Sequence, residues 1–146
     1  MVYPNHEVIQ NELDSLCKAT TSDFSGIAWM DHHDGRIRWL YASGNRNEQF
    51  KRLALKPGRG LAGLVLKLGR PFVIDCGMEE LERKRLQHDY SIMLVEQLHT
   101  AIALPIKIHD ETRAVLLIGN RSDRCYEPND IQLFSSLSAR FEHLLQ

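Results

Sequence analysis

The residues best placed to do chemistry lie in one glycine-rich stretch, residues 55–67, which reads LKPGRGLAGLVLK. It starts like a strand, turns over Pro57 and two glycines, and continues as an apolar helix. The first N–H groups of a helix have no partner inside it, and the helix dipole favours an anion at that end. Arg59 adds a positive charge. The stretch therefore suggests an anion site, although from the residues alone a plain tight turn with Arg59 in solvent is the commoner outcome.

Two other groups of residues invite a chemical interpretation that their spacing does not support. His32 and His33 are adjacent in a predicted turn, where neighbouring side chains face opposite ways, and no second ligand pair stands at a suitable spacing. We therefore expect a solvated hairpin tip and no metal site. Cys17, Cys76 and Cys125 are far apart and form no CxxC pair. We expect no disulfide framework, a small buried apolar role for Cys76, and a reducing, cytoplasmic compartment.

The elements that must position the glycine turn can be predicted from periodicity and turn signals. Asn5 is a candidate N-cap, Asp34-Gly35 is a hairpin signal, and Gly69 is a candidate C-cap. The predicted elements are a helix over 5–20, strands over 24–30 and 36–43, a strand ending at Leu55, the helix after Gly60, a strand over 71–76, a charged helical or mobile segment over 78–89, a short helix over 92–98, strands over 99–108 and 114–119, and a final helix that opens at 127–130.

This order predicts an α+β domain built on an antiparallel sheet. We expect the two terminal helices to pack on one face of the sheet. The central loops and short helices would cover the other face and close a ligand cavity there. Pro105 is awkward inside a central strand and indicates a bulge or an edge.

Composition suits one soluble globular domain spanning residues 1–146. Hydrophobic residues make up 43% and charged residues 25% of the chain, and the net charge is −1. This balance implies no broad attraction to nucleic acid or to an anionic membrane surface. No stretch approaches the roughly 20 apolar residues of a membrane helix, and residues 1–7 lack the pattern of a signal peptide.

Several motifs together resemble the GAF family. They are Leu55-x-Pro57-Gly58-x-Gly60-Leu61-Ala62-Gly63, then Gly69-x-Pro71, then Leu104-Pro105-Ile106, the strand ending at Gly119, and an amphipathic helix that begins near Asp130. The resemblance covers essentially the whole chain. It implies a single GAF domain, but it says little about function, because one fold hosts many ligands.

A narrower resemblance is to the NreA-type receptors, stand-alone cytoplasmic GAF proteins of bacterial nitrate and oxygen sensing. The motifs are Trp39-x-Tyr41-x-Ser43-Gly44-Asn45 with Phe50-Lys51, the glycine turn, and Tyr90-x-Ile92, with Ser91 where that family has proline. The resemblance implies nitrate held by the backbone amides of Leu61, Ala62 and Ile92, with Trp39 as an aromatic donor and Tyr90 as a wall. Without the resemblance, Trp39 and Ile92 would be interpreted as ordinary core residues.

The resemblance also implies what the protein does. It would be a non-enzymatic nitrate sensor without a cofactor, whose partner is the sensor histidine kinase of a two-component system. Apart from the resemblance, the charged and weakly patterned run 79–89 suggests that residues 78–98 close over the ligand and present an altered surface. The terminal helices could also expose a strip that pairs two copies into a homodimer.

Three alternatives belong to other classes of GAF protein. A free methionine sulfoxide reductase resembles this fold, but its family has a cysteine in the glycine turn, where this chain has Ala62, and the paired cysteines farther on are also missing. No Ser/His/Asp set or carboxylate pair is apparent either. A tetrapyrrole domain would need an attachment cysteine and a roomier pocket. A cyclic-nucleotide domain would need a larger cavity and ribose-binding residues, and spacing alone does not dismiss it.

Overall fold

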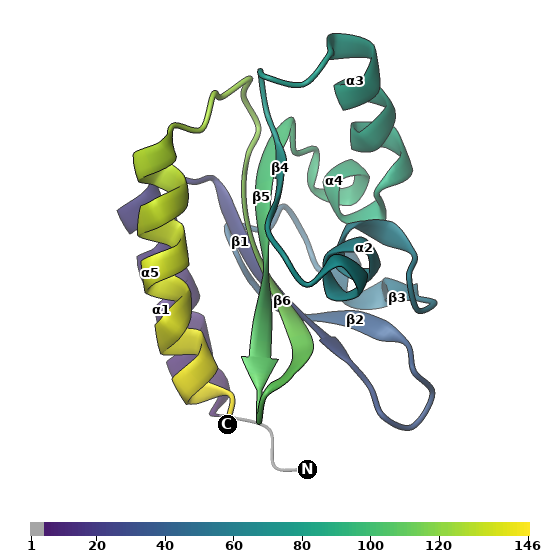
Figure 1. Ribbon diagram of the computed structural model, residues 1–146, viewed down its shortest axis with the longest axis vertical. Helices are drawn as coiled ribbons and strands as arrows, with labels where there is room; N and C mark the ends of the chain where they lie inside the picture. Colours follow the sequence, from purple (N-terminus) through teal and green to yellow (C-terminus); the bar gives the residue numbers. More distant parts are fainter. Residues whose placement is uncertain (1–4) are drawn as a thin grey trace.

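The computed structural model describes residues 5–146, in which one six-stranded antiparallel sheet is covered by helices on both faces (Figure 1). Residues 1–4 lie outside that range, and so does the part of the signal-peptide prediction that concerns them. The strands lie side by side in the order β3-β2-β1-β6-β5-β4. The α+β class and the antiparallel pairing predicted from the sequence are confirmed.

The elements follow the predicted order closely. They are α1 (His6–Thr20), β1 (Phe24–Met30), β2 (Ile37–Ser43), a 3-10 helix η1 (Gln49–Arg52), β3 (Ala54–Leu55), α2 (Gly60–Leu68), β4 (Phe72–Ile74), α3 (Glu80–Asp89), α4 (Ser91–Glu96), β5 (Thr100–Ile108), β6 (Glu111–Asn120) and α5 (Pro128–Leu144). The charged segment predicted as helical or mobile is the helix α3.

The terminal helices α1 and α5 lie together on one face of the sheet, as predicted (Figure 1). Asn5 caps α1, because its side chain accepts a hydrogen bond from the Glu7 N–H at 2.9 Å. The backbone N–H of Glu127 donates to the Asp130 carboxylate at 2.8 Å and fixes the start of α5. Their apolar stripes pack with inward residues of the strands into one cluster, which we call the helix-face cluster; it includes Leu13, Trp29, Leu116, Phe134 and Phe141.

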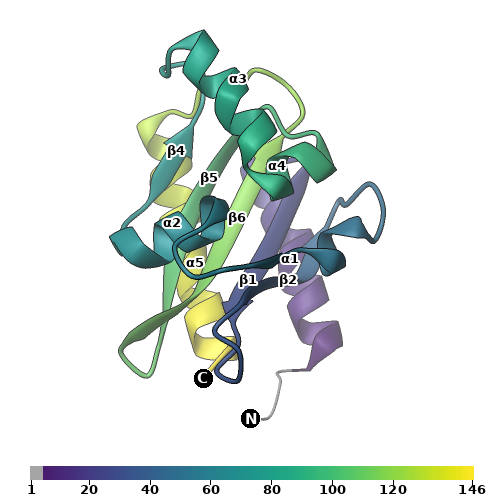
Figure 2. The same cartoon turned by 90° about the vertical axis from the view of Figure 1, so that its right-hand side faces the viewer.

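The short helices α2, α3 and α4 cover the opposite face, which Figure 2 turns toward the viewer. A second buried cluster, which we call the site-face cluster, fills the space beneath them. It includes Phe24, Trp39, Phe50, Leu61, Ala62, Val65, Ile74, Leu86, Ile92, Met93 and Val115. The sheet therefore separates two apolar cores, and only the second one contains the residues predicted to bind the anion.

Two irregularities shape the sheet. Ala28 pairs with Trp39 and Ile27 with Tyr41, so Leu40 is an extra residue, and this bulge in β2 directly follows Trp39. Pro105 lies in β5 beyond the three residues, 101–103, that pair with β4. A second register shift follows at Ile106. The missing N–H of proline is thus tolerated at an edge beside a bulge, which confirms the expectation for that position.

The cysteines depart from the sequence-based prediction. Cys76 and Cys125 form a disulfide across 49 residues of sequence, and both are exposed, so the expectations of no disulfide and of a buried apolar role for Cys76 are wrong. Spacing could not reveal the pair, because folding brings together the ends of β4 and of the loop after β6. Cys17, half-buried on α1, is the free cysteine of the described residues, and its burial raises the pKa of its thiol.

Within residues 5–146 there is no group of His, Cys, Asp and Glu side chains arranged to hold a metal ion. At the hairpin tip, the carboxylates of Asp31 and Asp34 instead pair with Arg38, at 3.4 Å and 2.6 Å, and cap the turn. Over the same residues no helix is long and apolar enough to cross a membrane.

Candidate anion-binding site

The glycine turn delivers the start of α2 to the buried side of the sheet without a side-chain cap. Arg59, the residue before the helix, is extended and makes no capping hydrogen bond, and its side chain is exposed. The N–H of Gly63 donates to the Arg59 carbonyl at 3.1 Å, so the helical ladder begins there. Leu61 and Ala62 lie before that point, and their N–H groups have no partner within the helix. Two donors at the positive end of α2 thus lack a partner within the helix.

The turn requires glycine at particular places. Gly58 has a φ of +77°, a conformation that L side chains rarely adopt. A Cβ on Gly63 would lie 2.8 Å from the carbonyl carbon of Gly58, so any side chain there would push the loop off the helix. The glycines therefore let the loop fold back tightly over the first turn of α2, and they bring Leu61 and Ala62 into the site-face cluster.

Trp39 places a buried donor on the same face. Its side chain is the largest fully buried one in the described chain, at 1% exposure, and its Nε1–H has no hydrogen-bond partner. Tryptophan N–H groups usually find a partner when they are buried. A buried donor left unsatisfied costs about 1–3 kcal/mol, so this group stands out from an ordinary core residue. This donor therefore lies in the same buried cluster as Leu61 and Ala62.

The third predicted element, the start of α4, also lacks a side-chain cap. Ile92 is the second residue of this short helix and is 2% exposed. Tyr90 precedes the helix, packs against the site-face cluster, and has a raised pKa because burial disfavours its charged form. Its φ of −86° and ψ of 111° are extended, which is the conformation a following proline requires. With Ser91 in place of proline, Tyr90 therefore still has the extended conformation that a following proline favours.

The structure brings four of the predicted residues into one buried cluster and places the fifth against it. Trp39, Leu61, Ala62 and Ile92 are members of the site-face cluster, and Tyr90 is a partly buried neighbour. The helices α2 and α4 contact each other, while η1 contacts both β2 and α4. Elements that are far apart in the sequence thus enclose the same apolar region, and the free donors that we can identify there are neutral.

Sequence reasoning missed the group that anchors α4. Glu96, the last residue of that helix, is fully buried and is the one acidic or basic residue in the buried set of residues 5–146. Its Oε1 accepts from the Arg46 backbone N–H and from Arg121 Nη2, both at 2.8 Å. Arg121 also donates to the carbonyls of Glu96 and Gly44. The only sequence signal was a single carboxylate inside the apolar run 92–98.

The match to a known family extends over nearly the whole chain. The GAF domain model matches residues 5–146. The chain belongs to the GAF family. The glycine turn, the two terminal helices on one face and the short helices on the other are therefore parts of a GAF domain, as the motifs predicted.

The relatives differ in what they indicate. A structure of an NreA protein from Staphylococcus aureus, mutated in its nitrate-binding site, is 36% identical, covers 81% of this chain and 86% of that chain, and has a TM-score of 0.70. The transcriptional activator RamA of Corynebacterium glutamicum is 29% identical over 120 residues, which are 81% of this chain but 41% of RamA. This chain thus spans less than half the length of that regulator.

Enzymes also share the architecture. A free methionine-R-sulfoxide reductase from Neisseria meningitidis, solved with its substrate, has a TM-score of 0.70 over 92% of this chain and 73% of its own. Its sequence identity is 16%, so the likeness is one of fold alone. The NreA structure, at 36% identity, is similar to this chain in sequence as well as in fold.

Proposed function

We propose that this GAF protein binds nitrate on the site face and works as a nitrate sensor. The observation that carries the proposal is the buried Nε1–H of Trp39, which has no partner in a cluster that also holds the uncapped first turn of α2. The similarity to a nitrate-binding NreA protein supports the same ligand. In this proposal the amides of Leu61, Ala62 and Ile92 and the Trp39 indole donate to the anion, while Tyr90 closes one side.

The donor set suits a weakly hydrated monoanion. Nitrate loses less hydration on burial than sulfate or phosphate, so neutral N–H donors at two helix starts suffice to hold it. The site-face cluster has no basic side chain among its members, and Arg59 is exposed. A divalent anion would leave much of its charge uncompensated there. The proposal therefore includes selectivity for nitrate over sulfate.

The residues of the site-face cluster do not suit methionine sulfoxide reduction. That chemistry needs a thiolate and a resolving cysteine at one pocket. None of the described members of the site-face cluster is a cysteine, and Ala62 occupies the position in the glycine turn where the reductase pattern has one. Cys17 lies on α1 at the opposite face of the sheet, and Cys76 is paired with Cys125 at the surface. A non-enzymatic sensor fits these placements better.

The proposed signal passes through residues 78–98. An anion can shift an equilibrium only if it binds one conformation more tightly than another. The helix α3 is the weakly attached part of this segment, because Leu86 is its buried residue and Leu81 is 75% exposed. We infer that nitrate draws α4 onto the ligand and moves α3 with it. The altered surface would be read by a sensor histidine kinase in the cytoplasm, its partner in a two-component system.

Isothermal titration calorimetry tests the ligand. Nitrate should give saturable one-site heat, while chloride, sulfate, methionine sulfoxide and cyclic nucleotides should give none. Heat with methionine sulfoxide or with a cyclic nucleotide instead of nitrate would replace the proposal with that alternative. Hydrogen exchange with and without nitrate then tests the moving segment. Equal protection of residues 78–98 in both states would contradict the proposed signal but leave nitrate binding standing.

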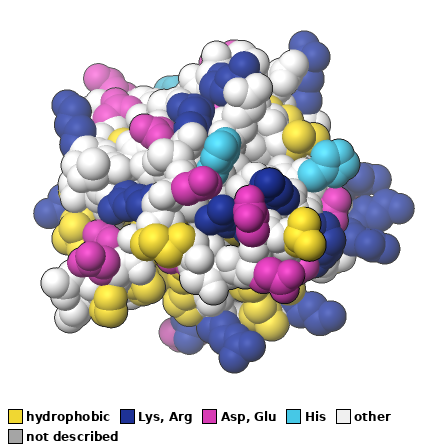
Figure 3. Space-filling model, turned by 90° about the horizontal axis from the view of Figure 1, so that it is seen from above, with side chains coloured by type: hydrophobic (Ala, Val, Ile, Leu, Met, Phe, Trp, Pro, Cys, Tyr) yellow, Lys and Arg dark blue, Asp and Glu magenta, His cyan; other side chains and the backbone are white. Residues whose placement is uncertain are grey.

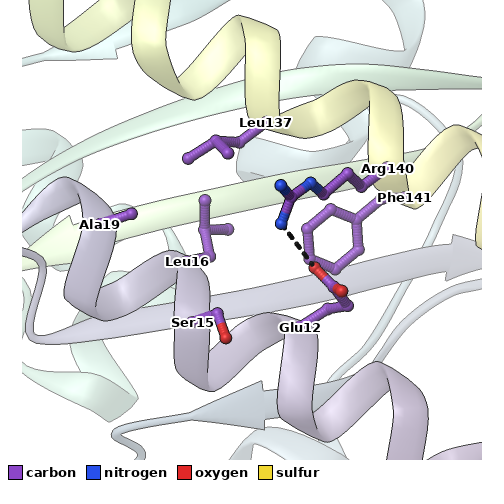
Figure 4. Close-up of a pocket in the computed structure, with 7 residues that line it drawn as sticks. All are labelled: Glu12, Ser15, Leu16, Ala19, Leu137, Arg140 and Phe141. Carbon is purple, nitrogen blue, oxygen red and sulfur yellow. Dashed lines mark ion pairs between the residues drawn. The ribbon is translucent and has the colours of Figure 1, made fainter.

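Pairing of two copies through α1 and α5 stays a prediction. Figure 4 shows the groove between these helices, in which Arg140 reaches toward Glu12 across 3.9 Å. Its lining residues are Glu12, Ser15, Leu16, Ala19, Leu137, Arg140 and Phe141. Sedimentation equilibrium tests the prediction, and a concentration-independent monomer would contradict it.

A further inference from the structure

The disulfide between Cys76 and Cys125 ties together two loops at the end of the molecule where α3 lies. Cys76 follows β4 and precedes α3, whereas Cys125 lies in the loop between β6 and α5 (Figure 1). Both residues are exposed, so a dissolved thiol can reach either sulfur. Acidic and basic side chains are mixed over this end of the molecule, so no patch of one sign dominates the approach of a charged thiol (Figure 3).

Hydrogen bonds beside the disulfide hold the two loops together independently of it. The Tyr126 N–H donates to the Asp75 carboxylate at 2.9 Å, and the Cys76 N–H donates to the Arg124 carbonyl at 3.4 Å. Arg124 is itself held by the carbonyls of Thr20 and Thr21. The two thiols of the reduced protein would therefore remain neighbours, and the bond can form again within one chain.

The bond matters because α3 has few other attachments. Its ion pairs Lys84–Glu80, Arg85–Glu82 and Arg85–Asp89 are exposed and lie within the helix, so they do not fasten it to the sheet. Apart from buried Leu86, the helix is held by Gln87 Nε2, which donates to the His99 carbonyl at 2.9 Å, and by Arg83, 3.7 Å from Asp123.

The disulfide at Cys76 and the hydrogen bonds of Glu96 hold the two ends of the segment 76–96. Cys76 lies four residues before α3, and Glu96 ends α4 in its hydrogen bonds to Arg46 and Arg121. Both attachments lead to the chain that follows β6, through Cys125 and Arg121. Opening the disulfide removes the covalent part of the first attachment, which is then held only by the hydrogen bonds of Asp75 and Arg124, while the second attachment is unchanged. The freedom of α3 is thereby linked to the oxidation state of two surface cysteines.

We propose that Cys76 and Cys125 form a reversible thiol–disulfide switch that sets how firmly α3 is held over the site face. A thiolate from a small thiol or a dithiol reductant attacks one sulfur, the S–S bond breaks, and the other cysteine leaves as a thiolate that takes up a proton. A second thiol then releases the mixed disulfide. In sum, the protein disulfide and two thiols give the protein dithiol and one small disulfide, and the reverse reaction restores the bond.

Redox titration with mass spectrometry tests the chemistry without nitrate. The protein is equilibrated in mixtures of reduced and oxidised glutathione, alkylated, and weighed. We expect the two alkylation sites to disappear together as the mixture becomes oxidising and to return with dithiothreitol. A protein that stays dithiol in every mixture overturns the proposal, and so does one that never opens. Cys17→Ser serves as the matched control and should titrate as the native chain does.

Hydrogen exchange tests the structural consequence. Amides of residues 80–90 should exchange at least ten-fold faster in the reduced protein, while those of β6 stay unchanged. The double variant Cys76→Ser/Cys125→Ser should match the reduced form in either mixture. Equal exchange of α3 in both states overturns the proposal.

The regulatory consequence rests on the proposed nitrate binding, and a separate measurement addresses it. Calorimetry should give an affinity for nitrate at least three-fold higher in the oxidised protein, because α3 leads directly into α4. Absence of nitrate heat in both states would overturn the proposed function and leave the switch supported by its titration and exchange. Equal affinity in both states would overturn the link between the switch and the ligand.

Discussion

The two faces of the sheet hide apolar clusters of similar kind but are closed in different ways. On the helix face, α1 and α5 run 15 and 17 residues, and both starts are fixed by side-chain hydrogen bonds. On the site face, α2, α3 and α4 run nine, ten and six residues, and none has a side-chain cap. The helix face thus satisfies its helix starts internally, whereas the site face leaves donors free.

The two tryptophans lie on neighbouring strands but belong to the clusters on opposite faces of the sheet. Trp29, on β1, belongs to the helix-face cluster and is 6% exposed. Trp39, on β2, belongs to the site-face cluster, directly before the Leu40 bulge, and its Nε1–H has no partner. A buried donor without a partner lowers stability unless something binds it. The helix face thus supports the fold, whereas the site face holds a buried donor without a partner, which is the donor that the proposed nitrate site uses.

Truncation of the helix-face core should give the largest loss of stability. Phe134 on α5 is fully buried, so Phe134→Ala removes an aromatic ring and leaves a cavity. We expect a loss of about 3–5 kcal/mol in the free energy of unfolding, measured by urea denaturation. Nitrate affinity of the folded variant should stay within two-fold of the native value. A large loss of affinity would show that the two faces are not separable.

Neutralising Glu96 should give a smaller loss of stability together with weaker binding. Glu96→Gln keeps the size of the side chain but removes its charge, so the hydrogen bond from the Arg46 backbone N–H becomes neutral and the ion pair with Arg121 becomes a hydrogen bond from a charged donor to a neutral amide oxygen. The expected loss is about 1–3 kcal/mol in the free energy of unfolding. Because α4 loses part of its anchor, nitrate affinity should fall three- to ten-fold. The control is Glu111→Gln at an exposed site, and equal effects of the two changes would contradict the anchoring role.

A proline at the start of α4 should be tolerated or slightly stabilising. Tyr90 already has the extended backbone that precedes proline, and Ser91 is the first residue of the helix. Ser91→Pro should therefore raise the free energy of unfolding by about 0.4–1 kcal/mol, because it restricts the unfolded chain. Nitrate affinity should not fall, since the Ile92 N–H is retained. A destabilised variant in thermal melts would show that the start of α4 differs from this description.

Sequence reasoning reached the features that local chemistry decides. The glycine turn predicted the start of α2, Asn5 predicted the cap of α1, and Pro105 predicted an edge or bulge in β5. The features it missed depend on which distant segments meet. The Cys76–Cys125 bond and the anchoring of Glu96 by Arg121 join residues that only the sheet order brings together.

The candidate site also has a part that local sequence decides and a part that depends on distant contacts. The uncapped amides of α2 follow from the local turn, so the sequence alone could indicate an anion-binding end. Trp39 and Ile92 read as ordinary core until the resemblance singled them out. The missing partner of the Trp39 indole could not be predicted, because it depends on every side chain packed around that ring and on the extra residue Leu40.

The proposed nitrate site is tested most directly by removing the indole N–H of each tryptophan in turn and measuring nitrate binding. Trp39→Phe and Trp29→Phe each remove one indole N–H from a buried aromatic side chain, but on opposite faces. Hydrogen bonds to charged groups contribute about 1.5–3 kcal/mol, so Trp39→Phe should weaken nitrate binding roughly 10- to 100-fold in calorimetry. Trp29→Phe should leave it within two-fold. Native affinity in folded Trp39→Phe, or an equal loss in both variants, would contradict the proposed nitrate site.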